Sequence, residues 1–175
     1  LSERGIEQAR RFRAFVRALS PARVVSSDLG RTRQTAGLIG HGDCPSDPRL
    51  REWDMGSWTG RTKPELIAAH ADLYHAWRAG THTPEGSEPW ATFRARVAEG
   101  LRHWLAVGEG DLLAVVHGGV IRAALDAFLQ IPPARVIPVT PGISTILSFA
   151  PGDFATAQLE GCNIGAVVPD LSVAD

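Results

Sequence analysis

The stretch that decides the fold is Asp111-Leu-Leu-Ala-Val-Val-His117-Gly118-Gly119-Val-Ile-Arg122, an apolar run that ends in a histidine and two glycines. An apolar run without a helical stripe is typical of a strand buried on both faces of a parallel sheet. His117 then lies at the carboxyl end of the strand, where open α/β sheets bind ligands, and N–H groups near Gly118 face an anion. The stretch predicts a phosphate site. The alternative for His117 is a buried histidine bonded to a neighbouring carbonyl.

A second stretch, Val24-Val-Ser26-Ser27-Asp28-Leu29-Gly30-Arg31-Thr-Arg-Gln-Thr35-Ala36, repeats this layout. A short β-branched run stops at two serines, and a helix begins with Asp28 or Ser27 as its expected N-cap. Arg31 falls in the first turn of this helix, where a cation opposes the helix dipole. A role in holding phosphate explains that placement better than a solvated surface charge does.

Composition excludes several other classes of protein. The chain has 175 residues, 44% of them hydrophobic, and a formal net charge of -1, which gives no reason to expect nucleic acid or a membrane surface as a partner. Cys44 and Cys162 are too few for a disulfide framework or a metal site, so we expect no metal, and a reducing cytoplasm is the default location. Helix and strand signals alternate along the chain, and a late hairpin is expected around residues 151–153. This order predicts one layered α/β domain over residues 1–175.

Two carboxylates are candidate acids. Glu52 is followed by Trp53, Met55 and Trp58, which could desolvate it, and desolvation raises the pKa of a carboxyl toward the range in which it donates a proton. Its alternative is a surface carboxylate paired with Arg49 or Arg51. Glu88 is the second candidate, and its alternative is an acid that marks the start of the helix expected from about Trp90.

Together these motifs resemble the histidine phosphatase superfamily, in its phosphoglycerate mutase-like branch. Five elements occur in the order of that family, from the first residue to beyond Arg122: Leu1-Ser-Glu-Arg-Gly5, Ser26-Ser-Asp-Leu-Gly-Arg31, Leu50-Arg-Glu-Trp-Asp-Met-Gly-Ser-Trp-Thr-Gly60, Pro84-Glu-Gly-Ser-Glu88 and His117-Gly-Gly-Val-Ile-Arg122. The resemblance implies a three-layer α/β sandwich with a mostly parallel central sheet flanked by helices. It also implies a substrate cap over about residues 62–88.

The resemblance assigns roles to individual residues. It implies that His117 and Arg31 are catalytic, that Glu52 protonates the leaving group, and that Ser27, Gly118 and Glu88 bind the phosphate. Ser87 and Pro89 depart from the family's Gly-Gly-Glu-Ser pattern, which puts the path of the Glu88 loop in doubt. Trp77, in the variable cap, is a candidate for the substrate pocket, with a place in the core as its alternative.

One element of the family is absent. Its nucleophile is a histidine in an Arg-His-Gly motif at the end of the first strand, and no Arg-His-Gly occurs in this sequence. We therefore expect this strand and its histidine upstream of Leu1. The implied activity is hydrolysis of small phosphorylated metabolites through a phosphohistidine, without a cofactor, and the compact cap favours a phosphatase over a mutase. A phosphate-binding pseudoenzyme is the alternative if the chain begins at Leu1, and a homodimer is left open.

Overall fold

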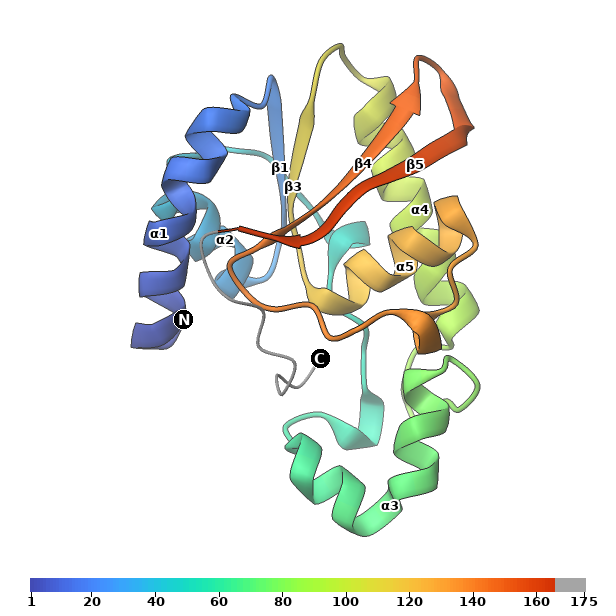
Figure 1. Cartoon of the computed structure of the whole chain (residues 1–175). Coiled ribbons are helices and arrows are strands. Elements are labelled where there is room, and N and C mark those ends of the chain that lie inside the picture. The colour runs from blue at the N-terminus through green and yellow to red at the C-terminus, as the bar shows by residue number, and fades with distance from the viewer. Residues whose placement is uncertain (166–175) are drawn as a thin grey trace.

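Three parallel strands form the sheet that positions the candidate site (Figure 1). The computed structural model describes residues 1–165. Strand β1 (Arg23–Ser27) lies between β2 (Ser46–Asp47) and β3 (Leu112–Val115), in the order β2-β1-β3. Ser26 of β1 is aligned with Val115 of β3, so both strands reach the same edge of the sheet. The two phosphate-site motifs therefore follow neighbouring parallel strands.

Helices cover both faces of this sheet. On one face, α1 (Glu3–Leu19) and α2 (Gly30–Leu38) pack Phe12, Val16 and Ile39 against Val115. On the other face lie α4 (Trp90–Ala106) and α5 (Gly118–Leu129), which pack against each other. The predicted three-layer α/β arrangement is confirmed. Among the described residues, no helix combines the length and apolar character needed to cross a membrane.

The expected hairpin is present as a second, antiparallel sheet. Strand β4 (Ser144–Ala150) pairs with β5 (Asp153–Ile164). Phe149 and Phe154 on the hairpin contact Phe128 of α5, with ring centroids 5.3 and 6.3 Å from the Phe128 ring. The hairpin therefore packs on the helix layer that also covers β3.

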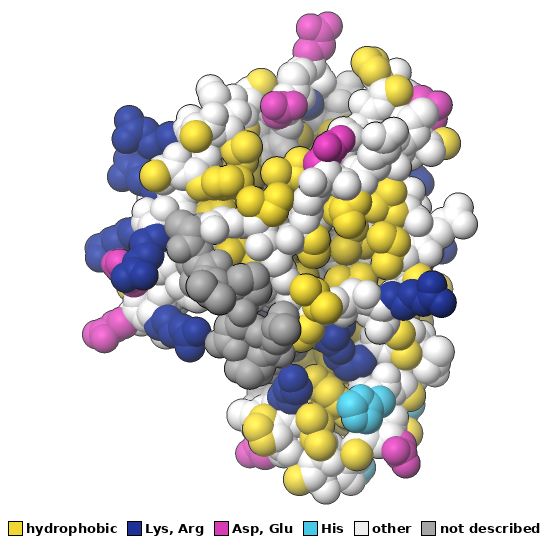
Figure 2. Space-filling model, in the orientation of Figure 1, with side chains coloured by type: hydrophobic (Ala, Val, Ile, Leu, Met, Phe, Trp, Pro, Cys, Tyr) yellow, Lys and Arg dark blue, Asp and Glu magenta, His cyan; other side chains and the backbone are white. Residues whose placement is uncertain are grey.

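The expectation that β3 is buried on both faces is wrong. Leu112, Leu113 and Ala114 are only half-buried, and Val115 alone is buried. The reason lies in the pairing of the strands, because within residues 1–165 β3 pairs only with β1 and β4 pairs only with β5. On the face drawn in Figure 2, apolar side chains are exposed over the region of these strands.

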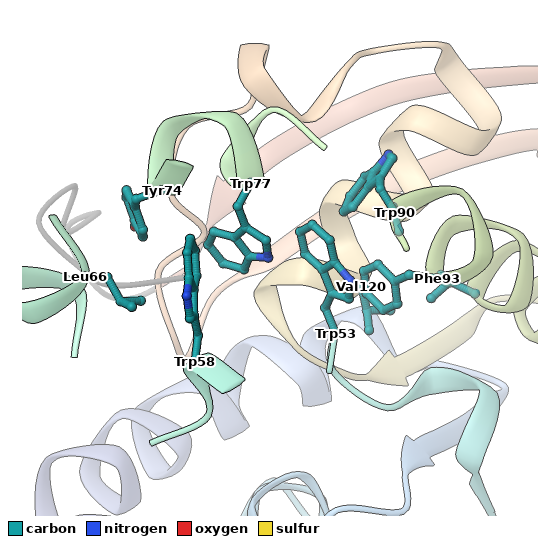
Figure 3. Packing of buried hydrophobic residues seen from close by; sticks show 10 residues of the cluster. Trp53, Trp58, Leu66, Tyr74, Trp77, Trp90, Phe93 and Val120 are labelled. Atoms are coloured by element: carbon teal, nitrogen blue, oxygen red, sulfur yellow. The ribbon is translucent and has the colours of Figure 1, made fainter. Parts of the chain in front are cut away.

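The expected cap region is built on α3 (Lys63–Arg78), which begins with a reciprocal capping box between Thr62 and Glu65 and bends at His70. Short 3-10 turns lie at Pro48–Leu50, Gly56–Trp58 and Pro133–Arg135. The cap packs its aromatic residues against the segment that follows Glu52, as Figure 3 shows. The domain limits of 1–175 stay a prediction, and their last ten residues, 166–175, lie outside the described part of the chain.

Candidate active site

His117 and Arg31 meet at the carboxyl edge of the sheet. Nε of Arg31 donates a hydrogen bond of 3.1 Å to Nδ1 of His117, and Nε2 of His117 lies 2.9 Å from Oγ of Ser27. Because Nδ1 accepts a hydrogen bond from a permanent cation, the proton of the neutral ring belongs on Nε2, which donates to Ser27. Burial, reinforced by the positive charge of Arg31, lowers the pKa of His117 to about 3. His117 is therefore a neutral imidazole bonded to a side chain and not to a neighbouring carbonyl.

Arg31 occupies the first turn of α2, as predicted, but the expected cap of that helix is wrong. Leu29 is the N-cap and makes no side-chain cap bond. The Ser27 hydroxyl does not cap the helix either, since its one bond to this region is a long one of 3.4 Å from the Leu29 amide. The carboxylate of Asp28 binds Arg51 instead, at 2.6 to 2.9 Å. No side-chain carboxylate therefore occupies the amides at the start of α2. The exposed Arg31 guanidinium adds a positive charge at this end of the helix.

Glu52 reaches the start of α5 beside His117. Its Oε2 accepts a bond of 3.2 Å from the Gly119 amide, and its Oε1 accepts one of 2.9 Å from the Trp53 amide. The approach requires glycine, since a Cβ on residue 119 would lie 2.2 Å from Oε1. Burial raises the pKa of Glu52, against the lowering effect of these two amides and of Arg122. The direction agrees with the desolvation argued from its aromatic neighbours.

The alternative role for Glu52, a surface ion pair, is contradicted by the arginines on either side of it. Arg49 pairs with Asp47 at 2.7 Å and with Glu99 at 3.0 Å. Arg51 pairs with Asp28 at 2.6 Å. Both cations are thus engaged elsewhere, and the Glu52 carboxyl turns to the backbone amides at the start of α5.

Glu88 does not join His117 and Arg31 through its carboxylate. It forms a two-pronged ion pair with Arg96, at 2.8 Å to Nε and 2.7 Å to Nη2. Gly118, by contrast, is the first residue of α5 and follows His117 directly, at the predicted place. The amide of the next residue, Gly119, donates to Glu52. Fewer backbone N–H groups are therefore available to an anion at this helix end than the sequence suggested.

Trp77 lies in the core and not at an open pocket. Its side chain is only 2% exposed, and its ring stacks on Trp53 with centroids 4.9 Å apart (Figure 3). The expectation that Trp77 lines the substrate pocket is therefore wrong, and its alternative, a place in the core, is correct. The reason is that α3 folds its apolar side inward, onto the aromatic residues that follow Glu52.

Arg96 and Arg122 are residues near the site to which the sequence interpretation gave no role. Arg122 is 1% exposed, and its guanidinium carbon lies 5.8 and 5.9 Å from the ring centres of Trp77 and Trp90. Its place at the end of the His-Gly-Gly-Val-Ile-Arg motif was a signal for it. Arg96 lies in the middle of α4, and its spacing from Glu88 fits the family pattern without indicating a role for it. Among residues 1–165, no group of three or more His, Cys, Asp or Glu side chains is placed to hold a metal ion.

Sequence comparisons agree with this geometry. A model of the histidine phosphatase superfamily (branch 1) matches residues 1–160. A probable phosphoglycerate mutase of Cronobacter sakazakii is 31% identical over 95% of this chain and 72% of its own length. An adenosylcobalamin/alpha-ribazole phosphatase of Salmonella typhimurium is 32% identical over 78% and 70%. A glucosyl-3-phosphoglycerate phosphatase of Mycobacterium tuberculosis is 35% identical over 77% and 66%.

Solved structures agree as well. The native mycobacterial glucosyl-3-phosphoglycerate phosphatase superimposes with a TM-score of 0.82 at 30% identity, covering 95% of this chain and 88% of that one. Its complex with inorganic phosphate gives 0.83 at 29% identity, covering 97% and 89%. The family model matches most of this chain, and the solved relatives share its fold. This chain therefore belongs to the histidine phosphatase superfamily, branch 1.

Proposed function

We propose that this protein hydrolyses small phosphomonoesters through a phosphohistidine intermediate, as its family membership suggests. The observation that carries the proposal is the contact between Arg31 and His117, 3.1 Å long, beside a carboxyl group whose pKa is raised by burial. The Arg31 cation suits the charged oxygens of a phosphoryl group, and the neutral imidazole of His117 accepts a hydrogen bond that orients this cation. A protonated carboxyl suits a leaving oxygen that needs a proton.

The proposed reaction has two steps. A histidine nitrogen attacks phosphorus, the phosphorus–oxygen ester bond breaks, and Glu52 gives its proton to the departing alcohol. Arg31 and the amide of Gly118 hold the remaining phosphoryl oxygens, and Nδ1 of His117 positions the Arg31 guanidinium. Water then attacks the phosphohistidine, the Glu52 carboxylate takes a proton from it, and the nitrogen–phosphorus bond breaks to release inorganic phosphate. Ser27 keeps the His117 ring oriented through the bond to Nε2.

The nucleophile in this proposal comes from a strand that precedes Leu1. Two observations support a place for it. Within residues 1–165, β3 and β4 each lack a strand on one edge, and the helix layer of α4 and α5 packs against the β4–β5 hairpin as well. A strand inserted between β3 and β4 would join the two sheets and bring its carboxyl end to the edge that holds His117.

The substrate class in this proposal is a small phosphorylated metabolite. Its support is the pair of relatives named as glucosyl-3-phosphoglycerate phosphatase and adenosylcobalamin/alpha-ribazole phosphatase. A relative named as a probable phosphoglycerate mutase favours phosphoryl transfer between phosphoglycerates as the second candidate. The two functions differ in the acceptor of the phosphoryl group, which is water in one and a second hydroxyl in the other.

Hydrolysis of p-nitrophenyl phosphate tests the proposal. The 175-residue chain is compared with the full-length product of its gene, from acid to neutral pH and with a chelator present. Turnover by the full-length protein alone, with phosphate bound covalently to a histidine after acid-free quenching, is the expected result. Inactivity of both proteins toward this substrate and a panel of sugar phosphates would favour the pseudoenzyme, and isomerisation of phosphoglycerates would favour the mutase.

A further inference from the structure

Arg96 makes five side-chain hydrogen bonds near the site, and the proposed mechanism gives it no role. Two of its bonds go to the carboxylate of Glu88, and three go to backbone carbonyls. The carbonyls are those of Arg49 and Arg51, both 2.9 Å from Nη1, and of Glu52, 3.2 Å from Nη2. A guanidinium has five N–H donors, so these five bonds use all of them.

The three carbonyls belong to the short segment that carries the Glu52 side chain. This segment has no helix or sheet of its own beyond the turn at Pro48–Leu50, so its backbone depends on other parts of the chain for its position. Arg96 projects from the middle of α4, a 17-residue helix. The helix therefore supplies a rigid base from which one planar group holds the backbone at Glu52.

Glu88 completes the arrangement from the other side. Its carboxylate neutralises Arg96, and the pair is largely shielded from water, with side-chain exposures of 16% and 23%. Its backbone carbonyl accepts a bond of 2.6 Å from Nε1 of Trp53, and its amide donates a weaker one of 3.4 Å to the Asp54 carbonyl. The loop of Glu88 and the segment of Glu52 are thus tied together both through Arg96 and directly.

We propose that Arg96, with Glu88 as its counter-ion, is the positioning residue for the general acid Glu52, holding its backbone so that its carboxyl reaches the Gly119 amide. This inference rests on the proposed function for the role of Glu52. It gives Glu88 a task other than binding phosphate. Since lysine has three donors and no planar fork, Arg96→Lys keeps the charge but cannot hold the carbonyls and the carboxylate together.

The environment of Glu52 provides a test that needs no activity. Full-length protein labelled with ¹³C at glutamate carboxyls is titrated by NMR, and the Glu52 signal is assigned by its loss in Glu52→Gln. Because burial keeps the pKa of Glu52 high, loosening its backbone should admit water and lower that pKa by about one unit in Arg96→Lys. Arg94→Lys is the matched control, since Arg94 lies on the same helix, is 43% exposed and faces Asp126 at 3.6 Å. A Glu52 pKa that is equal in all three proteins would overturn the inference.

Kinetics separate positioning from simple loss of stability. A general acid matters most for a poor leaving group, so Arg96→Lys should lower kcat for glycerol phosphate about tenfold more than kcat for p-nitrophenyl phosphate, at nearly unchanged KM. Equal losses on both substrates would contradict a role through Glu52. Glu88→Gln, which keeps an amide oxygen for Arg96, should give a smaller effect of the same pattern, and it replaces Arg96→Lys if that variant does not fold. A wild-type protein inactive on every phosphomonoester would refute the proposed function, while the NMR result would still decide whether Arg96 holds Glu52.

Discussion

Replacement of Gly119 by alanine measures how closely Glu52 must approach the start of α5. The added Cβ would lie 2.2 Å from Oε1 of Glu52, whereas a carbon and an oxygen in contact are ordinarily about 3.3 Å apart. The carboxyl must therefore retreat by about 1 Å. A displacement of that size at a reacting group costs on the order of 100-fold in rate. We expect a comparable loss of kcat in full-length Gly119→Ala.

The same substitution should also have a limited effect on stability, which can be worked out from the bonds it breaks. The carboxyl gives up its bonds to the amides of Gly119 and Trp53, each contributing about 0.5–1.5 kcal/mol. Alanine is better than glycine inside a helix by about 1 kcal/mol, and residue 119 has no positive φ to oppose it. The net change in the free energy of unfolding should thus be a loss of no more than about 2 kcal/mol, measured by urea denaturation.

Gly30→Ala is the control for this experiment. Gly30 begins α2 as Gly118 begins α5, and a Cβ there would meet nothing within 4 Å. It should keep the wild-type kcat. Loss of activity by both variants, or full activity of Gly119→Ala, would refute the argument that the glycine serves the approach of Glu52.

Three further predictions concern the site and its support. Arg31→Ala should lower kcat/KM for p-nitrophenyl phosphate about 100- to 1,000-fold, as loss of one oxyanion donor does, without changing the urea midpoint, because this side chain is exposed; a loss below tenfold would contradict its role. Between pH 6.5 and 4 His117 takes up a proton in the unfolded chain but not in the folded chain, where its pKa is about 3. The wild type should therefore lose up to about 3 kcal/mol of stability as the pH falls through this range. The His117→Asn variant should lose less stability over that range. Because Glu52 titrates in both proteins, its contribution cancels, and parallel curves of unfolding free energy against pH would refute the low pKa of His117. Gly56→Ala should destabilise the fold by at least about 2 kcal/mol in urea, because φ is +53° and its Cβ would lie 2.3 Å from the Glu85 carbonyl oxygen, and an unchanged midpoint would count against this close approach.

Local patterns in the sequence predicted the elements well where their causes are local. Helix α1 begins after Ser2 because the Ser2 hydroxyl accepts a bond from the Gly5 amide, an interaction between residues three apart. Strands β1 and β3 end at Ser27 and Val115, and in each case two residues separate the strand from the first residue of the next helix. The failure at β3 has a different origin, since burial of a strand depends on what lies beside it.

The sequence by itself thus determined the layered α/β fold, the repeated strand-to-helix layout of the Arg31 and His117 motifs, and the superfamily. Strand and helix signals repeat over a few residues, and parallel strands align their carboxyl ends, so these features follow without knowledge of side-chain directions.

Only the tertiary structure decided which side chains meet. The contacts from Arg96 to Glu52 and from Glu52 to Gly119 join residues 44 and 67 positions apart, and the burial of Trp77 follows from the way α3 packs on Trp53. Such contacts depend on how whole elements pack and on which rotamers that packing allows, and no short stretch of sequence contains that information.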